Sequence, residues 1–134
     1  MKIGVMVESF RQGFHGGVEK AAALGAQGIQ AYATYGELAP ENMTEEKIRE
    51  ALDFVKSHGL VFSALCGDFG HGFMNPDDNK IYVEKSKRVL DLAKKLECNV
   101  VTTHIGTVPE EENETKEIMR KACRELAEYA DSVD

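Results

Sequence analysis

The chain has 134 residues, the length of a single domain, and its 43% hydrophobic and 29% charged residues are typical of globular proteins. The formal net charge of −7 makes the surface repel phosphate backbones, so we expect no nucleic-acid partner. No apolar run approaches the ~20 residues needed to span a bilayer, so we expect no membrane partner either.

The three cysteines, Cys66, Cys98 and Cys123, argue against two kinds of stabilising framework. Their number is odd and no two form a CxxC pair, so neither a disulfide framework nor a zinc cluster is expected. The start MKIGVMVESF has a glutamate and no cleavage-type tail, so it is interpreted as a strand rather than a signal peptide. We therefore expect a cytoplasmic protein in which Cys98 and Cys123 are small core residues.

The amino-terminal segment predicts a strand followed by a helix. Apolar residues alternate over 2–8 with a methionine between them, which is typical of a parallel strand buried on both faces. A loop is expected over 11–17. Small and apolar residues then recur at the spacing of one helical face, beginning at Val18, and two glycines lead into a second strand over 29–32.

The next segment predicts a second helix and a third strand. The helix is expected to begin after Thr44, a good N-cap, and to end before Gly59, which stands where a glycine closes a helix. The third strand is predicted over 60–65. A long glycine-rich loop is expected over 66–79.

The remaining segment predicts a third helix with an inner apolar stripe ending at Leu96, a fourth strand over 100–103, and a last helix over 115–130 whose apolar face is buried.

Repeated strand-then-helix units predict an α/β fold with parallel strands in the order 1-2-3-4 and helices outside them. Four units are half of an eight-stranded (β/α)8 TIM barrel. We expect one domain over 1–134, a (βα)4 half-barrel without its carboxyl-terminal half.

The loops that follow the strands are long and rich in glycine, histidine and acidic residues, whereas those that follow the helices are short. In parallel α/β folds, ligands bind at the carboxyl ends of the strands. The sequence therefore predicts one active face, with these candidate residues: Glu8, Tyr32, Cys66, Asp68, His71 and His104.

Each candidate has a functional and a structural interpretation. His104 ends the fourth strand, where an imidazole can be an acid or base, a metal ligand or a hydrogen-bond donor to a substrate, or a structural residue bonded to a backbone carbonyl. Glu8 is either a base that accepts sugar hydroxyl protons, or a solvated acid, or the partner of Arg11 in an ion pair. His71 lies in a glycine-rich loop that either approaches a ligand or is simply mobile. Asp68 can cap a turn, and Cys66 can fill a strand end.

Several short segments, in order along the chain, resemble one group of enzymes. They are KIGVM (2–6), ALCGD (64–68), HGF (71–73) and VVTTHIG (100–106), together with APEN (39–42) and EKSKRVLDLA (84–93). The group is the sugar phosphate isomerase/epimerase family, within the xylose isomerase-like TIM barrel superfamily. The resemblance covers essentially the whole chain and corresponds to the amino-terminal half of the barrel.

The resemblance implies metal-assisted proton transfer between adjacent carbons of a sugar or sugar phosphate, with manganese, or alternatively zinc or magnesium, as the cofactor. It implies catalytic roles for His104 and Glu8, and substrate-binding roles for His71, Tyr32 and Cys66. The main metal ligands of the family lie in the missing half. No firm metal site is therefore expected in this chain. His104 and His71 are the residues that could contribute ligands to one.

The function expected for the intact protein is that of a sugar or sugar-phosphate isomerase or epimerase with a small-molecule sugar as its partner. A non-catalytic half-barrel fragment that self-associates is one alternative, because open edges on the first and fourth strands invite pairing. An endonuclease IV-like phosphodiesterase is another, although the net charge of −7 lacks the basic track that DNA requires.

Overall fold

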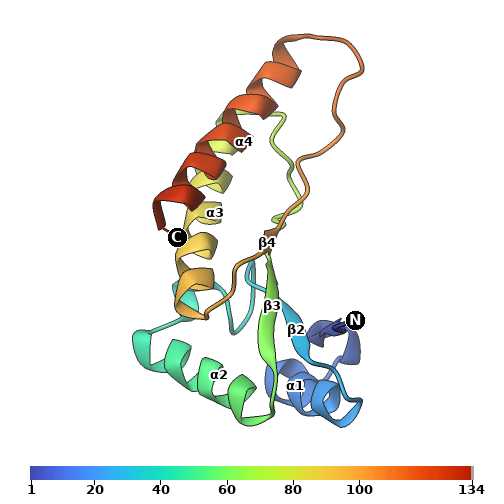
Figure 1. The fold of residues 1–134 in the computed structure, drawn as a ribbon. Coiled ribbons are helices and arrows are strands. Elements are labelled where there is room, and N and C mark those ends of the chain that lie inside the picture. The colour runs from blue at the N-terminus through green and yellow to red at the C-terminus, as the bar shows by residue number, and fades with distance from the viewer. Residues whose placement is uncertain (134) are drawn as a thin grey trace.

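The computed structural model describes residues 1–133, in which four strands form one parallel sheet (Figure 1). The strands are β1 (Gly4–Met6), β2 (Gly28–Tyr32), β3 (Val61–Cys66) and β4 (Val101–Thr102). Their order in the sheet is β1-β2-β3-β4. This order confirms the predicted succession of strand-then-helix units.

Four α-helices alternate with the strands: α1 (Gly13–Ala23), α2 (Glu45–Ser57), α3 (Pro76–Lys95) and α4 (Glu114–Val133). Two 3₁₀ turns, η1 (Val7–Phe10) and η2 (Pro40–Asn42), lie within the loops that follow β1 and β2. None of the helices within residues 1–133 combines the length and the apolar composition needed to cross a membrane.

The core lies between the helices and one face of the sheet. Its fully buried side chains come from both layers and include Val18, Ile29, Val55, Leu65, Val89 and Leu96. The other face of the sheet is open and largely polar. On it Gln30 Nε2 donates to Thr102 Oγ1 at 3.2 Å, and a Cβ on Gly4 would lie 2.9 Å from Ser63 Oγ.

The predicted bounds of the first strand, over 2–8, and of the first loop, over 11–17, were wrong. Helix α1 begins at Gly13, within the glycine-containing segment that was predicted to be a loop. Only Gly4–Met6 forms a strand, and this edge strand is not buried on both faces, since Ile3 is 53% exposed. The chain then turns through η1, and residues 13–17 of the predicted loop are helical. A Cβ on Gly17 would lie 2.8 Å from the Val7 carbonyl oxygen, so this glycine lets α1 pack directly on the turn.

Helix α3 also begins earlier than predicted, at Pro76, which shortens the loop after β3. The Asn75 side-chain oxygen accepts hydrogen bonds from the backbone N–H groups of Asp77 and Asp78, at 2.8 and 3.2 Å. The proline stands at the first helical position, where it needs no N–H partner. Local capping chemistry therefore sets this boundary.

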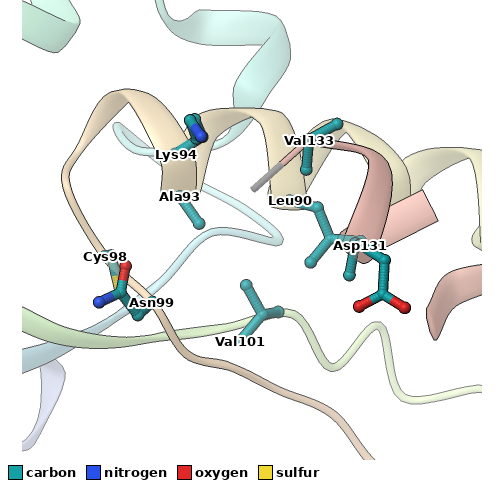
Figure 2. A pocket seen from close by; sticks show the side chains of 9 residues that line it. Leu90, Ala93, Lys94, Cys98, Asn99, Val101, Asp131 and Val133 are labelled. Atoms are coloured by element: carbon teal, nitrogen blue, oxygen red, sulfur yellow. The ribbon is translucent and has the colours of Figure 1, made fainter. Parts of the chain in front are cut away.

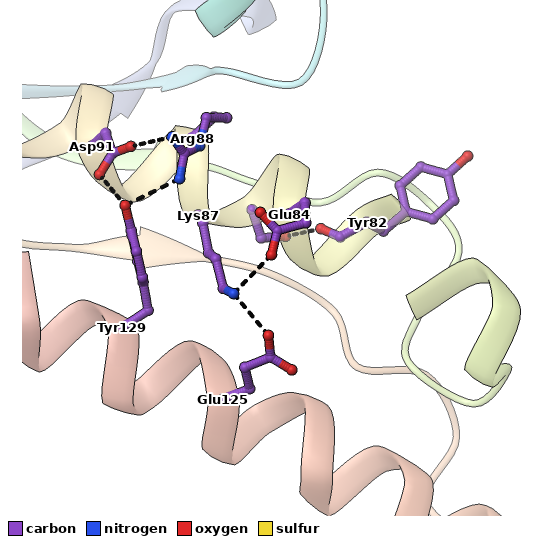
Figure 3. A network of polar contacts seen from close by, with 8 residues as sticks. Tyr82, Glu84, Lys87, Arg88, Asp91, Glu125 and Tyr129 are labelled. Carbon is purple, nitrogen blue, oxygen red and sulfur yellow. Dashed lines mark hydrogen bonds and ion pairs between the residues drawn. The ribbon is translucent and has the colours of Figure 1, made fainter. Parts of the chain in front are cut away.

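Helix α4 is attached to the molecule chiefly through α3, beside which it lies in Figure 1. Figure 3 shows the polar part of this interface, where Lys87 Nζ donates to Glu84 at 2.8 Å and to Glu125 at 2.7 Å. The Glu125 carboxylate, followed by that of Glu84, raises the pKa of Lys87. Further along, Tyr129 donates to Asp91 at 2.7 Å.

The predicted burial of the apolar face of α4 is only partly confirmed. Met119 and Ala122 are buried, whereas Cys123, Leu126 and Ala130 are half-buried. The reason is the position of α4 at the end of the helix layer, where α3 covers one side of it. Of the two predicted core cysteines, Cys98 is 5% exposed and Cys123 is the half-buried one.

Replacing Thr44 with alanine is expected to lower the free energy of unfolding by about 1 kcal/mol. The Thr44 hydroxyl accepts a hydrogen bond from the backbone N–H of Lys47 at 3.2 Å, and so satisfies one of the free donors at the start of α2. Urea denaturation followed by circular dichroism measures the change. Thr107→Ala, in the exposed loop before α4, is the matched control and should leave the unfolding midpoint unchanged.

Candidate functional site

The carboxyl ends of the four strands carry the predicted site residues at one edge of the sheet. Tyr32 and Cys66 are the last residues of β2 and β3 and are register partners. Glu8 follows β1 within η1, and His104 follows β4. Parallel strands end at the same edge, so the structure brings these four residues to one end of the sheet, as the sequence predicted.

The closest polar contact on this face joins Asp68 and His104. Asp68 Oδ2 lies 2.6 Å from His104 Nδ1, and Asp68 Oδ1 accepts a hydrogen bond from the backbone N–H of Gly70 at 2.8 Å. The Gly70 N–H and then the imidazole lower the pKa of the Asp68 carboxyl. The His104 side chain is 85% exposed, so its Nε2 remains accessible while Nδ1 is held. A carboxylate placed in this way fixes the orientation and tautomer of an imidazole.

The loop after β3 is tied to the loop after β4, which places His71 near this pair. The backbone N–H of Phe73 donates to the Ile105 carbonyl at 2.9 Å. Gly72 has φ +61°, and a Cβ there would lie 2.9 Å from the same carbonyl oxygen. The His71 ring stacks on Tyr82 of α3, with centroids 4.1 Å apart and planes at 18°. The cavity between His71, Tyr82 and His104 is only about 10 Å³, so the side chains themselves fill it.

A second group of residues surrounds Glu8. Its Oε1 accepts the backbone N–H of Tyr32 at 2.8 Å, whereas its Oε2 is buried and has no hydrogen-bond partner among the described residues. A cavity of about 340 Å³ adjoins it, lined on its polar side by Glu8, Arg11, Tyr32 and Tyr35. Within residues 1–133, Glu8 and Arg11 form no ion pair. An unpaired carboxylate oxygen beside a cavity is an acceptor available to a ligand hydroxyl.

Tyr32 stands between the two groups. Its pKa is raised first by the Cys66 thiol and then by partial burial, with smaller contributions from Tyr35 and from the Glu8 and Asp68 carboxylates. The phenol therefore keeps its proton at neutral pH and can donate a hydrogen bond. Cys66 is only 6% exposed, so its thiol lies beneath this surface and not on it.

Sequence reasoning left the roles of two residues unrecognised. Asp68 was expected to cap a turn and does so, but its second oxygen also orients His104. Tyr82 gave no signal, because nothing in a helical pattern shows that a half-buried tyrosine of α3 meets a loop histidine. No three His, Cys, Asp or Glu side chains within the described residues converge as a set that could hold a metal ion.

Comparisons with known proteins agree with this architecture. No curated protein sequence matches the chain. Among solved structures, a xylose isomerase domain protein from Planctomyces limnophilus is 21% identical with a TM-score of 0.81, over 98% of this chain and 50% of that chain. D-psicose 3-epimerase from Clostridium cellulolyticum H10 is 17% identical with a TM-score of 0.78, over 99% and 50%. 3-Keto-D-glucoside 4-epimerase from E. coli is 16% identical with a TM-score of 0.79, over 99% and 53%.

These likenesses show a shared fold, and the chain spans about half the length of the structures that it matches. The predicted half of a TIM barrel is thus confirmed. A family model described as a xylose isomerase-like TIM barrel matches residues 18–133. Because that match extends over most of the sequence, the chain belongs to the xylose isomerase-like TIM barrel family.

Proposed function

We propose that this chain provides the acid–base and substrate-holding groups of a sugar or sugar-phosphate isomerase or epimerase. The observation that carries the proposal is the Asp68–His104 pair at the carboxyl ends of adjacent strands, with one imidazole nitrogen held and the other accessible. Family membership supports it, as do two of the matched structures, which are both sugar epimerases.

The reaction requires a proton to leave a carbon next to a carbonyl group and to return either to the neighbouring carbon or to the opposite face of the same carbon. With Nδ1–H donated to Asp68, His104 Nε2 carries a lone pair and can accept such a proton or a hydroxyl hydrogen bond. The resulting imidazolium is stabilised by the Asp68 carboxylate and can return the proton in the second half of the reaction.

The Glu8 group suits the binding of sugar hydroxyls. Glu8 Oε2 supplies an acceptor, and the protonated phenol of Tyr32 supplies a donor at the same cavity. Tyr32 and Tyr35, with ring centroids 5.4 Å apart, give that cavity an aromatic wall. Acceptors and donors beside an aromatic surface are what a sugar, with its hydroxyls and apolar C–H faces, requires.

The resemblance also implies a divalent metal, manganese first, and a bound cation would stabilise the enediolate formed by proton removal. The side chains of residues 1–133 do not supply three converging ligands, so they do not fit such a site by themselves. We therefore derive no step through a metal. Metal dependence remains part of the proposal for the intact protein and is included in its test.

The test is proton exchange with solvent. The protein is incubated in D₂O with a panel of ketoses and ketose phosphates, and proton NMR follows loss of signal at the carbons next to the carbonyl. We expect exchange and slow conversion of at least one sugar, measured with Mn²⁺ and with a chelator in parallel. Absence of exchange for every sugar under both conditions would contradict the proposal.

A further inference from the structure

The ring of His71 is held by a contact from outside its own loop. His71 stands between Gly70 and Gly72, whose φ values of +79° and +61° lie in the region that glycine enters readily. Its side chain is exposed, and within residues 1–133 neither ring nitrogen forms a hydrogen bond or an ion pair. A histidine flanked in this way has no interaction within the loop that fixes its ring.

The contact is the stack on Tyr82 of α3. The two ring centroids lie 4.1 Å apart with their planes at 18°. Such a pair favours one geometry by more than the area it buries. Tyr82 is half-buried, and its hydroxyl forms no hydrogen bond within the described residues, so the contact is made by the face of the ring and not by the polar group.

Tyr82 is itself fixed in place on α3. Its ring centroid lies 5.6 Å from that of Phe69 and 5.7 Å from the ammonium nitrogen of Lys85. Figure 3 shows the Tyr82 ring on the side of α3 that points away from α4, where it takes no part in the polar contacts between the two helices. The ring therefore serves the loop after β3 and not the helix pair.

Backbone contacts fix the ends of this loop but leave the direction of the imidazole open. On one side the Gly70 N–H donates to Asp68 at 2.8 Å, and on the other the Phe73 N–H donates to the Ile105 carbonyl at 2.9 Å. Neither bond involves the histidine side chain, which can still turn about its own χ angles. The stack on α3 is the contact that selects one orientation.

The selected orientation brings His71 to the acid–base pair. His71, Tyr82, Asp68 and His104 all line one cavity of about 10 Å³. A space of this size is filled by the side chains around it. The His71 ring is therefore in the immediate surroundings of the imidazole that the proposed function uses.

We propose that Tyr82 is a positioning residue, whose ring holds the His71 imidazole in the orientation that hydrogen-bonds a sugar hydroxyl. This role rests on the proposed function, because it concerns how one substrate-binding residue of that site is kept in place. Only molecules with His71 in this orientation bind the sugar well, so the apparent dissociation constant rises as their fraction falls. Proton transfer at His104 does not pass through Tyr82.

The stack is measured first, without any sugar. Protons of an imidazole above a phenol ring are shifted upfield in the NMR spectrum by the ring current. The chain has four histidines, and His71→Gln assigns the His71 signals by removing them. We expect the upfield shift in the wild type and in Tyr82→Phe, which keeps the ring, and its loss in Tyr82→Ala.

Sugar binding is measured next, by NMR titration with the ketoses and ketose phosphates of the exchange assay, beginning with D-fructose and D-fructose 6-phosphate. We expect Tyr82→Ala to raise the dissociation constant of the bound sugar by about 2–10-fold and Tyr82→Phe to match the wild type. The exchange rate at saturating sugar should stay unchanged. In His71→Gln, adding Tyr82→Ala should weaken binding no further, since the ring then has no imidazole to hold.

Leu90→Ala is the matched control. Leu90 is another half-buried side chain of α3, and it lines a cavity of about 500 Å³ beside β4 (Figure 2). Cys98 and Asn99, which directly precede β4, line the same cavity, so it lies at the amino ends of the strands, away from His71. This variant alters the packing of the same helix and should bind the sugar like the wild type. Circular dichroism verifies that all variants fold.

An unshifted His71 signal in the wild type would overturn this role, as would additive losses in the double variant or an equal loss in Leu90→Ala. A slower exchange at saturating sugar with unchanged affinity would also overturn it, because Tyr82 would then act on the chemistry. If the wild type binds a sugar and these results are contrary, the role of Tyr82 fails alone. If the wild type binds no sugar of the panel, the proposed function fails, and the role of Tyr82 fails with it.

Discussion

Replacing His104 with glutamine is expected to lower the rate of proton exchange by about 10²–10⁴-fold, the usual contribution of a positioned acid–base group. Glutamine keeps hydrogen-bonding capacity near Asp68 but cannot accept a proton at neutral pH. The substrate dissociation constant should change much less, because the loss falls on the proton-transfer step. The NMR exchange assay measures both quantities when the sugar concentration is varied.

His58→Gln is the matched control, since His58 lies at the end of α2 with its Nδ1 2.9 Å from the Phe54 carbonyl oxygen, away from the active face. Its exchange rate should equal that of the wild type. Equal rates in all three proteins would show that His104 takes no part in the chemistry and that another base must be sought.

Asp68→Asn distinguishes positioning from a purely structural role. The pKa of Asp68 is lowered, so its carboxylate stays ionised as the pH falls below the ordinary range of an aspartate. The asparagine variant keeps an acceptor for the Gly70 N–H, but its neutral amide no longer stabilises the imidazolium that forms during proton transfer. We expect its exchange rate to fall while the dissociation constant of the sugar changes much less. An unchanged exchange rate would assign Asp68 to the turn alone.

Replacing Leu65 with alanine is expected to lower the free energy of unfolding by about 2–5 kcal/mol. Leu65 is fully buried in β3, one of the two inner strands, where its side chain packs in the main core. Truncation removes apolar contacts on several sides and leaves a cavity in the core. The cavity cannot close easily, because β3 is held in place by β2 on one side and β4 on the other. A domain is stabilised by only about 5–15 kcal/mol, so the loss is a large part of the total.

Val61→Ala in the same strand is the control. Val61 is 55% exposed on the open face, so its truncation should cost less than about 0.5 kcal/mol. Chemical denaturation of both variants at a fixed protein concentration separates the two effects. A similar cost at both positions would contradict the assignment of Val61 to a solvent-exposed face.

What the sequence could predict depended on the range of the interactions involved. The cap at Thr44 and the closing glycine at Gly59 act within a few residues, and both were predicted correctly. The start of α1 was missed, because its glycines are typical of a loop in the sequence. Gly17 is helical in the structure, where the absence of a Cβ lets it pack against Val7.

The same reasoning applies to the candidate site. The period of strand-then-helix units placed Tyr32, Cys66 and His104 on one face, since topology alone brings the strand ends together. The pairing of Asp68 with His104 was not predictable, because it joins loops whose conformations depend on one another through the Phe73–Ile105 hydrogen bond. Which residues share a face is thus encoded locally, whereas which of them touch is decided by long-range packing.

The division of the core into two clusters has a consequence for synthesis on the ribosome. The main cluster takes its buried residues from Val7 to Cys98, and the smaller one joins Phe73 and Val83 to Ala122. A nascent chain can therefore complete its main core before α4 has been translated, since domains fold as their residues emerge. Helix α4 then docks onto a surface that is already formed, and this step needs no rearrangement of the main core.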